Sequence, residues 1–99
     1  MTPLFSVFTT PRFDRLARAL ERQHHQQFTD RYEEAIEILG ADPYNRTRRH
    51  PIRKLESVPA GEGQYRLSLT RWRFRYDITG RDVVLHYCGL RREDTYGRR

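Results

Sequence analysis

YRLSLTRWRFRYDI, at residues 65–78, carries the clearest structural signal in the chain, because apolar and polar side chains alternate along it. Apolar residues stand at every second position from 65 to 69 and again from 72 to 78, which is the period of a β-strand with one buried face. The sequence TGRD at 79–82 predicts a hairpin turn, and the apolar run at 83–88 predicts a further strand. We therefore expect the second half of the chain to form antiparallel strands of one sheet.

Helical patterns precede this sheet. Residues 4–10 are rich in aromatic and β-branched side chains and predict a first strand, after which Thr10 and Pro11 are typical of a helix start. Apolar residues at helical spacing predict one helix from 11 to about 23 and a second from 28 to 39, which ends before Gly40. Residues 24–27 are expected to form the turn between them, and residues 52–55 a short extended piece.

The predicted elements follow the order βααβββ, with a short C-terminal helix. This order predicts an α+β fold in which a helical hairpin packs on a mainly antiparallel, four-stranded, twisted sheet. A chain of 99 residues has the size of one domain, so we expect residues 1–99 to form a single domain.

Composition excludes several classes of protein. Aromatic residues make up 12% of the chain, which argues against disorder. A single cysteine, Cys88, excludes a disulfide within the chain and a cysteine-based zinc site. The sequence shows neither the apolar run of a transmembrane helix nor the pattern of a signal peptide, so we expect a cytoplasmic protein without a membrane partner.

The net charge of +6 is unevenly distributed along the chain. Residues 1–45 hold 5 arginines and 7 acidic residues, a balance of −2, whereas residues 46–99 hold 14 basic and 6 acidic residues, a balance of +8. A basic half beside a slightly acidic half is typical of a protein that binds a polyanion through one face.

Strand alternation assigns the arginines of the predicted sheet to one face. If the apolar residues of 65–78 meet the helices, Arg66, Arg73 and Arg75 project from the opposite face. Neighbouring strands lie ~4.8 Å apart, so these guanidinium groups cluster, and their repulsion favours a bound anion such as phosphate. The alternative interpretation is a solvated outer face. The arginines expected to add to the cluster are Arg46, Arg48, Arg49, Arg53, Arg91 and Arg92.

Taken in order, the motifs of the second half resemble the RelE/ParE toxin superfamily. These motifs are Lys54-Leu55, Tyr65-Arg66-Leu67, WRFRYDI at 72–78, the apolar strand at 83–88 and GLRREDTY at 89–96. Together with the helical hairpin, the resemblance covers nearly the whole chain. It implies a RelE-like fold and the role of a toxin in a type II toxin–antitoxin system, held inactive by a cognate antitoxin.

The resemblance leaves three activities open. RelE-type members are metal-independent endoribonucleases that cut mRNA in the ribosomal A site by attack of a ribose 2′-hydroxyl on the adjacent phosphate, and this activity is favoured here. ParE-type members inhibit DNA gyrase and do not cut RNA. A toxin-derived binding module without activity is the third alternative. In each case we expect the antitoxin as partner, operator DNA bound only through the toxin–antitoxin complex, and no cofactor.

Site residues are carried over from the resemblance position by position. The catalytic residues that it implies are Arg66, Arg73, Arg92 and Tyr96, with Arg91 as the alternative late arginine. Ser68 departs from the pattern, because RelE-type enzymes carry a second basic residue at this position. The residues expected to bind RNA or phosphate are Lys54, Arg75, Arg91, Arg49 and Arg53.

The general base of such a reaction is left open by the sequence. An arginine is unsuited to this role at neutral pH because its pKa exceeds ~12, and the alternatives are Lys54, His50 and His86. His86 stands in the middle of an apolar strand, where a satisfied buried histidine is favoured over a catalytic one. No metal site is expected, because the adjacent His24 and His25 point apart on a helix.

Overall fold

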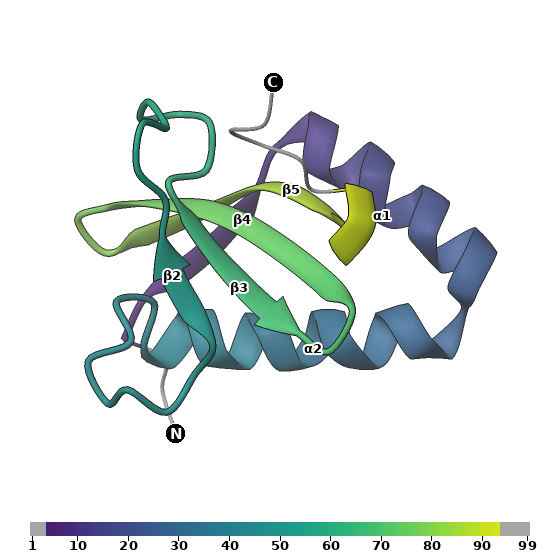
Figure 1. Cartoon of the computed structure of the whole chain (residues 1–99), viewed down its shortest axis with the longest axis horizontal. Coiled ribbons are helices and arrows are strands. Elements are labelled where there is room, and N and C mark those ends of the chain that lie inside the picture. Colours follow the sequence, from purple (N-terminus) through teal and green to yellow (C-terminus); the bar gives the residue numbers. More distant parts are fainter. Residues whose placement is uncertain (1–3, 94–99) are drawn as a thin grey trace.

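Five strands form one twisted sheet in the computed structural model, which describes residues 4–93 (Figure 1). Their spatial order is β1-β5-β4-β3-β2; β1 pairs with β5 in parallel, and every other neighbouring pair is antiparallel. The strands are β1 (Ser6–Thr9), β2 (Ile52–Lys54), β3 (Tyr65–Leu69), β4 (Trp72–Thr79) and β5 (Asp82–Leu90). The prediction of a mainly antiparallel sheet is confirmed, but the predicted number of four strands is wrong.

The additional strand is β2, at one edge of the sheet. The sequence predicts only an extended piece here, because three residues are too few to show an alternating pattern. Pairing with β3 makes the segment a strand: Ile52 lies opposite the fully buried Leu67, and Arg53 lies opposite Arg66. This strand therefore depends on a partner in space rather than on a local preference.

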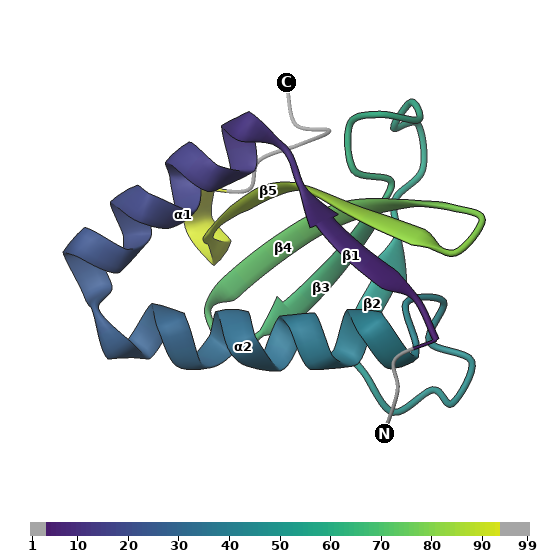
Figure 2. The same ribbon diagram turned by 180° about the vertical axis from the view of Figure 1, so that it is seen from behind.

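Within residues 4–93, two α-helices cover one face of the sheet, as Figure 2 shows. They are α1 (Pro11–His24) and α2 (Gln26–Ala41). The side chain of Thr10 caps α1 by accepting a hydrogen bond from the N–H of Phe13 at 3.1 Å. His25, with a φ of 54°, is the one residue between the helices, so α2 begins two residues before its predicted start.

The end of β5 leads into a 3₁₀ turn, η1 (Arg91–Glu93), where the sequence predicts a short C-terminal helix. The remainder of that predicted helix lies outside the described residues. Among residues 4–93, neither helix combines the length and apolar character that crossing a membrane requires.

The hydrophobic core lies between the helices and the sheet. Leu67 of β3 and Phe74 and Tyr76 of β4 are fully buried, and they alternate in sequence as predicted. Phe28 of α2 stacks on Phe74 with ring centres 6.2 Å apart. Each large apolar side chain buried in this way stabilises the fold by roughly 1.5–3 kcal/mol. Because these side chains face the helices, the residues between them in β3 and β4 face the other way.

Candidate functional site

The face of the sheet that the helices leave open, turned toward the viewer in Figure 1, carries a cluster of arginines. Arg53 of β2 lies opposite Arg66 of β3, and Arg66 lies opposite Arg75 of β4. In the next pair, Ser68 lies opposite Arg73. Directly opposite residues of antiparallel strands share a face. Arg53, Arg66, Arg73 and Arg75 therefore form one cluster, here called the arginine face, as strand alternation predicts for the last three.

Arg73 lies at the end of the arginine face next to the turn between β3 and β4. Its Nη1 donates to two carbonyl oxygens of this turn, at 2.9 and 3.0 Å. β5 ends beside the same turn, since the N–H of Arg91 donates to the carbonyl oxygen of Arg71 at 2.7 Å. The structure thus brings Arg73 and the backbone of Arg91 and Arg92 to one end of the sheet, whereas Tyr96 lies outside the described residues.

Arg75 is a buried anchor for the loop at residues 59–64. Arg75 is only 7% exposed. Its Nε donates a hydrogen bond to the carbonyl oxygen of Gly63 at 3.2 Å, and its Nη2 donates one to the carbonyl oxygen of Glu62 at 2.9 Å. A charged donor makes such hydrogen bonds stronger than neutral ones. The sequence predicts a phosphate ligand at Arg75 but not this structural role, because alternation gives the face on which a side chain lies but not its partners.

Two of the basic residues predicted to bind phosphate lie away from the arginine face. Lys54 is opposite Tyr65 and therefore on the other face of the sheet, with its Nζ 5.6 Å from the centre of the Tyr65 ring. Arg49 stands on the loop between α2 and β2 and lines a separate cavity of about 560 Å³. Neither position follows from the sequence, because the pairing of β2 and the path of this loop are tertiary features.

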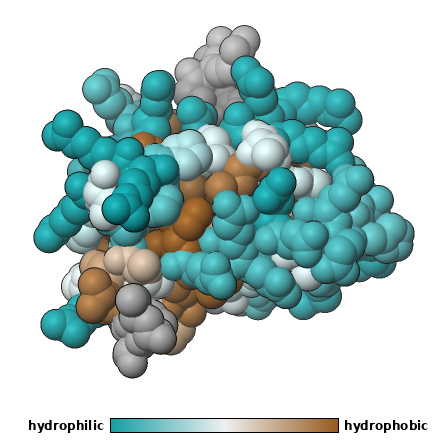
Figure 3. Space-filling view, turned by 90° about the horizontal axis from the view of Figure 1, so that it is seen from below, coloured by the Kyte–Doolittle hydropathy of each residue, from teal (hydrophilic) through white to brown (hydrophobic). Residues whose placement is uncertain are grey.

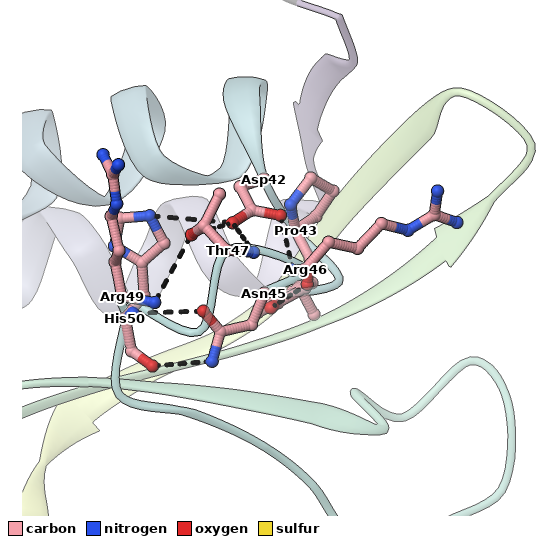
Figure 4. A network of polar contacts seen from close by, with 8 residues as sticks. Asp42, Pro43, Asn45, Arg46, Thr47, Arg49 and His50 are labelled. Atoms are coloured by element: carbon pink, nitrogen blue, oxygen red, sulfur yellow. Dashed lines mark hydrogen bonds and ion pairs between the residues drawn. The ribbon is translucent and has the colours of Figure 1, made fainter.

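A network of hydrogen bonds shapes the loop that follows α2 (Figure 4). The carboxylate of Asp42 accepts from the N–H of Arg46 at 2.8 Å and from the hydroxyl of Thr47 at 2.7 Å. The Asn45 side chain both donates to and accepts from the backbone of His50, at 2.8 and 3.0 Å. Burial would raise the pKa of Asp42, but these hydrogen bonds outweigh it and lower that pKa. The labelled arginine side chains point away from the network.

The cavity beside this loop combines apolar walls with arginines. Its apolar lining includes Leu4, Phe5, Pro43 and Tyr44, and its arginines are Arg46, Arg49 and Arg81. Leu4 is 65% exposed and Tyr44 is 40% exposed, so large apolar side chains beside this cavity reach the surface. Figure 3 shows apolar side chains gathered on this side of the molecule, with hydrophilic ones around them. Such a patch is typical of a surface that contacts another protein.

Asp77 of β4 holds the loop at 59–64 from the other side. Its carboxylate accepts hydrogen bonds from the N–H groups of Gly61 at 2.8 Å, Gly63 at 3.1 Å and Gln64 at 2.8 Å. The same carboxylate lies 3.0 Å from Nε2 of His86 on β5. One buried aspartate therefore positions both a loop and a histidine ring.

His86 reaches this position because β5 carries a bulge. Arg75 pairs with Tyr87 and Tyr76 pairs with Leu85, so His86 is an extra residue between two pairs. A bulge commonly re-aims a side chain. The His86 ring has a polar partner, as predicted, but that partner is Asp77 on the open side of the sheet and not a group within the hydrophobic core. One feature of the sequence indicates this site: Asp77 stands in the row of alternate β4 positions that otherwise carries Arg73 and Arg75.

The His86 ring also lines a cavity of about 410 Å³ at this end of the open face. The other lining residues come from the start of α1, from the loop at 59–64 and from β4: Thr10, Pro11, Arg12, Gly61, Glu62 and Arg75. Within residues 4–93, no three histidine, cysteine, aspartate or glutamate side chains gather closely enough to hold a metal ion.

Comparison with known proteins gives a likeness in structure only. No family model matches the sequence, and no curated protein matches it. A chain of the archaeal RelE–RelB complex from Pyrococcus horikoshii OT3 superposes with a TM-score of 0.63 at 20% identity, over 97% of this chain and 99% of that one. YafQ from E. coli strain BL21(DE3) superposes with a TM-score of 0.61 at 12% identity, over 89% of this chain and 94% of that one. The chain therefore has the RelE-like fold that its sequence motifs predict.

Proposed function

We propose that this chain is the toxin of a type II toxin–antitoxin pair and stops translation by cutting ribosome-bound mRNA. The observation that carries the proposal is the arginine face, on a RelE-like fold. Arg66 lies between Arg53 and Arg75 on neighbouring strands, and like charges directly opposite one another destabilise a sheet. A phosphodiester backbone laid over this face would place its negative charges along this row of positive ones.

The proposed reaction is attack of a ribose 2′-hydroxyl on the adjacent phosphorus, which yields a cyclic phosphate and a free 5′-hydroxyl. Its transition state carries extra negative charge on the phosphate oxygens, and positioned cations stabilise that charge. Arg66 and Arg73 are the strand residues proposed for this role, with Arg92 or Arg91 at the end of β5. Tyr96 completes the set by stacking on a base or by moving a proton, and no metal ion takes part.

The proposed partners follow from the same surfaces. A cognate antitoxin would cover the arginine face with an acidic or amphipathic segment, and the complex would contact operator DNA through the antitoxin. The free toxin would act on mRNA in the ribosomal A site, in the cytoplasm. The exposed apolar patch around Leu4 and Tyr44 supports a protein partner.

Translation in vitro with a defined message tests the activity. We expect wild-type protein to cut ribosome-bound message and to leave naked RNA intact, with chelator present or absent. Arg73→Ala should slow cleavage by about 100- to 1,000-fold, the usual effect of removing one group that stabilises transition-state charge. Tyr96→Phe should also be impaired. Arg22→Ala is the matched control, because Arg22 is an exposed arginine of α1 rather than of the sheet.

Two results would contradict the proposal. Intact message with correctly folded wild-type protein, together with inhibition in a gyrase supercoiling assay, would assign the chain to the ParE type of activity. Normal growth on induced expression without the antitoxin, with both assays blank, would identify a binding module that lacks toxin activity.

A further inference from the structure

The pair formed by Asp77 and His86 has the arrangement of a proton-transfer site. The carboxylate of Asp77 accepts three backbone N–H groups from the loop at 59–64. A carboxylate in this role only accepts hydrogen bonds, so the Nε2 that lies 3.0 Å away carries the proton of the neutral ring. The lone pair of the neutral imidazole then resides on Nδ1, which can take a proton.

Asp77 is itself held in place from several directions. Gly61 and Gly63 donate to Oδ2 and Gln64 donates to Oδ1, and these donors come from a loop that Arg75 also anchors. The side chain of Asp77 is 11% exposed and that of His86 is 19% exposed. A carboxylate with little freedom to turn holds the imidazole that it contacts in one orientation. An efficient base needs such an orientation as well as a free lone pair.

The cavity in front of His86 has room and charge for a phosphodiester. Arg12 from α1 and Arg75 from β4 line it, and Arg12 also lies over the ring of Tyr87, 5.6 Å from its centre. Glu62 lines the loop side. The charged groups around His86 are therefore two arginines and two carboxylates, one of which is Asp77. The volume of about 410 Å³ exceeds that of one phosphate group, and Arg75 of the arginine face is one of the lining residues.

Strand geometry relates this cavity to the arginine face. Arg73, Arg75 and Asp77 alternate along β4, and successive members of such a row stand about 6.8 Å apart, twice the rise of ~3.4 Å per residue. His86 is joined to the last member of the row, and Arg73 is the first. Arg73 and Asp77 therefore stand about 14 Å apart along β4, so a single RNA strand laid along β4 would span about two phosphate spacings between Arg73 and the cavity of His86.

We propose that His86, positioned by Asp77, is the general base that the arginines themselves cannot supply; this inference rests on the proposed ribonuclease function. Nδ1 of His86 takes the proton from the ribose 2′-hydroxyl, while the oxygen of that hydroxyl forms a bond to phosphorus. The bond from phosphorus to the 5′ oxygen breaks, and that oxygen takes a proton from water. The resulting hydroxide takes the proton back from His86, so the ring and the solvent end unchanged. Arg12, which lines the cavity, binds the RNA strand there.

Single-turnover cleavage of ribosome-bound message, measured from pH 5 to 9, tests this inference with variants at two histidines. His86→Gln removes the base and should slow cleavage by about 100-fold or more, which is the usual contribution of a general base. It should also flatten the rise in cleavage rate with pH that a general base produces. His25→Gln is the matched control, because His25 is an exposed residue between the helices, and it should keep the wild-type rate and pH profile.

Asp77→Asn distinguishes a positioning role from a purely structural one. On its own it should slow cleavage, because an amide no longer orients the ring in the same tautomer. Combined with His86→Gln it should cause little further loss, since both substitutions disable the same step. Thermal unfolding of each variant, and binding to the antitoxin, show whether the fold is intact; Arg12→Ala in the same assay should raise the message concentration needed for half-maximal rate.

The possible failures are separable. If the wild type cuts message and His86→Gln cuts it at the same rate with the same pH profile, the role of His86 is wrong while the ribonuclease proposal stands. If the wild type cuts no message, both proposals are wrong. A large further loss in the double variant would overturn the positioning role of Asp77.

Discussion

At the scale of single residues, the arginines on the open face of the sheet differ in their hydrogen-bonding partners and in their exposure. Arg75 is buried and donates to the carbonyl oxygens of Gly63 and Glu62, whereas Arg53 is exposed at the edge strand. Both side chains belong to the same face of the sheet. The difference comes from the loop at 59–64, which folds over one part of the face and leaves the rest open.

Arg75 is therefore expected to matter first for stability. Arg75→Lys keeps the charge but cannot reproduce the two separated donors of the guanidinium, so it should lower the free energy of unfolding by about 1.5–3 kcal/mol. Urea denaturation measures the change. Arg22→Lys, on the exposed surface of α1, should stay within about 0.5 kcal/mol of the wild type. Equal stability of the two variants would show that the hydrogen bonds of Arg75 contribute nothing net.

At the scale of elements, the loop at 59–64 is shaped by its two glycines. Gly61 has a φ of 94° and Gly63 a φ of 86°, values that side chains other than glycine rarely adopt. Both N–H groups donate to Asp77, so the loop, β4 and the His86 ring are fixed together. The two sites differ in their surroundings: a Cβ at Gly61 meets nothing within 4 Å, whereas one at Gly63 comes within 2.9 Å of the Cβ of Arg75.

This contrast predicts unequal costs for one substitution at two positions. Gly61→Ala should lower the free energy of unfolding by about 1–2 kcal/mol, the cost of the backbone conformation alone. Gly63→Ala should lower the free energy of unfolding by more, because the new Cβ also comes too close to the Cβ of Arg75, and either the loop or β4 must move to relieve this contact. Urea denaturation of both variants checks the order, and a smaller effect at Gly63 than at Gly61 would contradict it. In the cleavage assay, Gly63→Ala should also lower the rate through the displaced Asp77.

At the scale of the whole molecule, two ionisable groups in the core make the fold sensitive to high pH. Burial, and to a lesser extent Asp14, raises the pKa of the Cys88 thiol from its ordinary value of 9.0 to about 12. Burial likewise raises the pKa of Tyr76, whose hydroxyl donates to the carbonyl oxygen of Pro43 at 2.7 Å. Both groups hold their protons more tightly in the folded chain than in the unfolded one, so their contribution is present below pH 9 and is lost as the pH rises.

We expect the free energy of unfolding to fall by about 1 kcal/mol between pH 9 and 10 through Cys88 alone, and then by about 1.4 kcal/mol per unit. Cys88→Val keeps a small apolar side chain at this position without an ionisable group. Urea denaturation at pH 8, 9 and 10 should show the full decline in the wild type and a smaller one in the variant, where Tyr76 still responds as the pH approaches 10. Parallel declines would place the sensitive group elsewhere.

Much of the fold and part of the candidate site follow from local patterns in the chain. The alternation at 65–78 assigns Leu67, Phe74 and Tyr76 to the core and Arg66 and Arg73 to the other face, because side chains of a strand alternate whatever the strand packs against. Helical spacing and the Thr10 cap likewise place the hairpin of helices. These features depend on residues within a few positions of one another, and they are readable for that reason.

The chemistry of the open face depends on contacts between distant positions. Asp77 holds N–H groups 13 to 16 residues away, Arg75 holds carbonyl groups of the same loop, and His86 joins them only because a bulge in β5 interrupts the alternation. β2 becomes a strand through its pairing with β3, which puts Arg53 on the arginine face and Lys54 on the other. Local periodicity holds no information about which loop folds over which strand, so the partners of these side chains emerge only when the sheet is assembled.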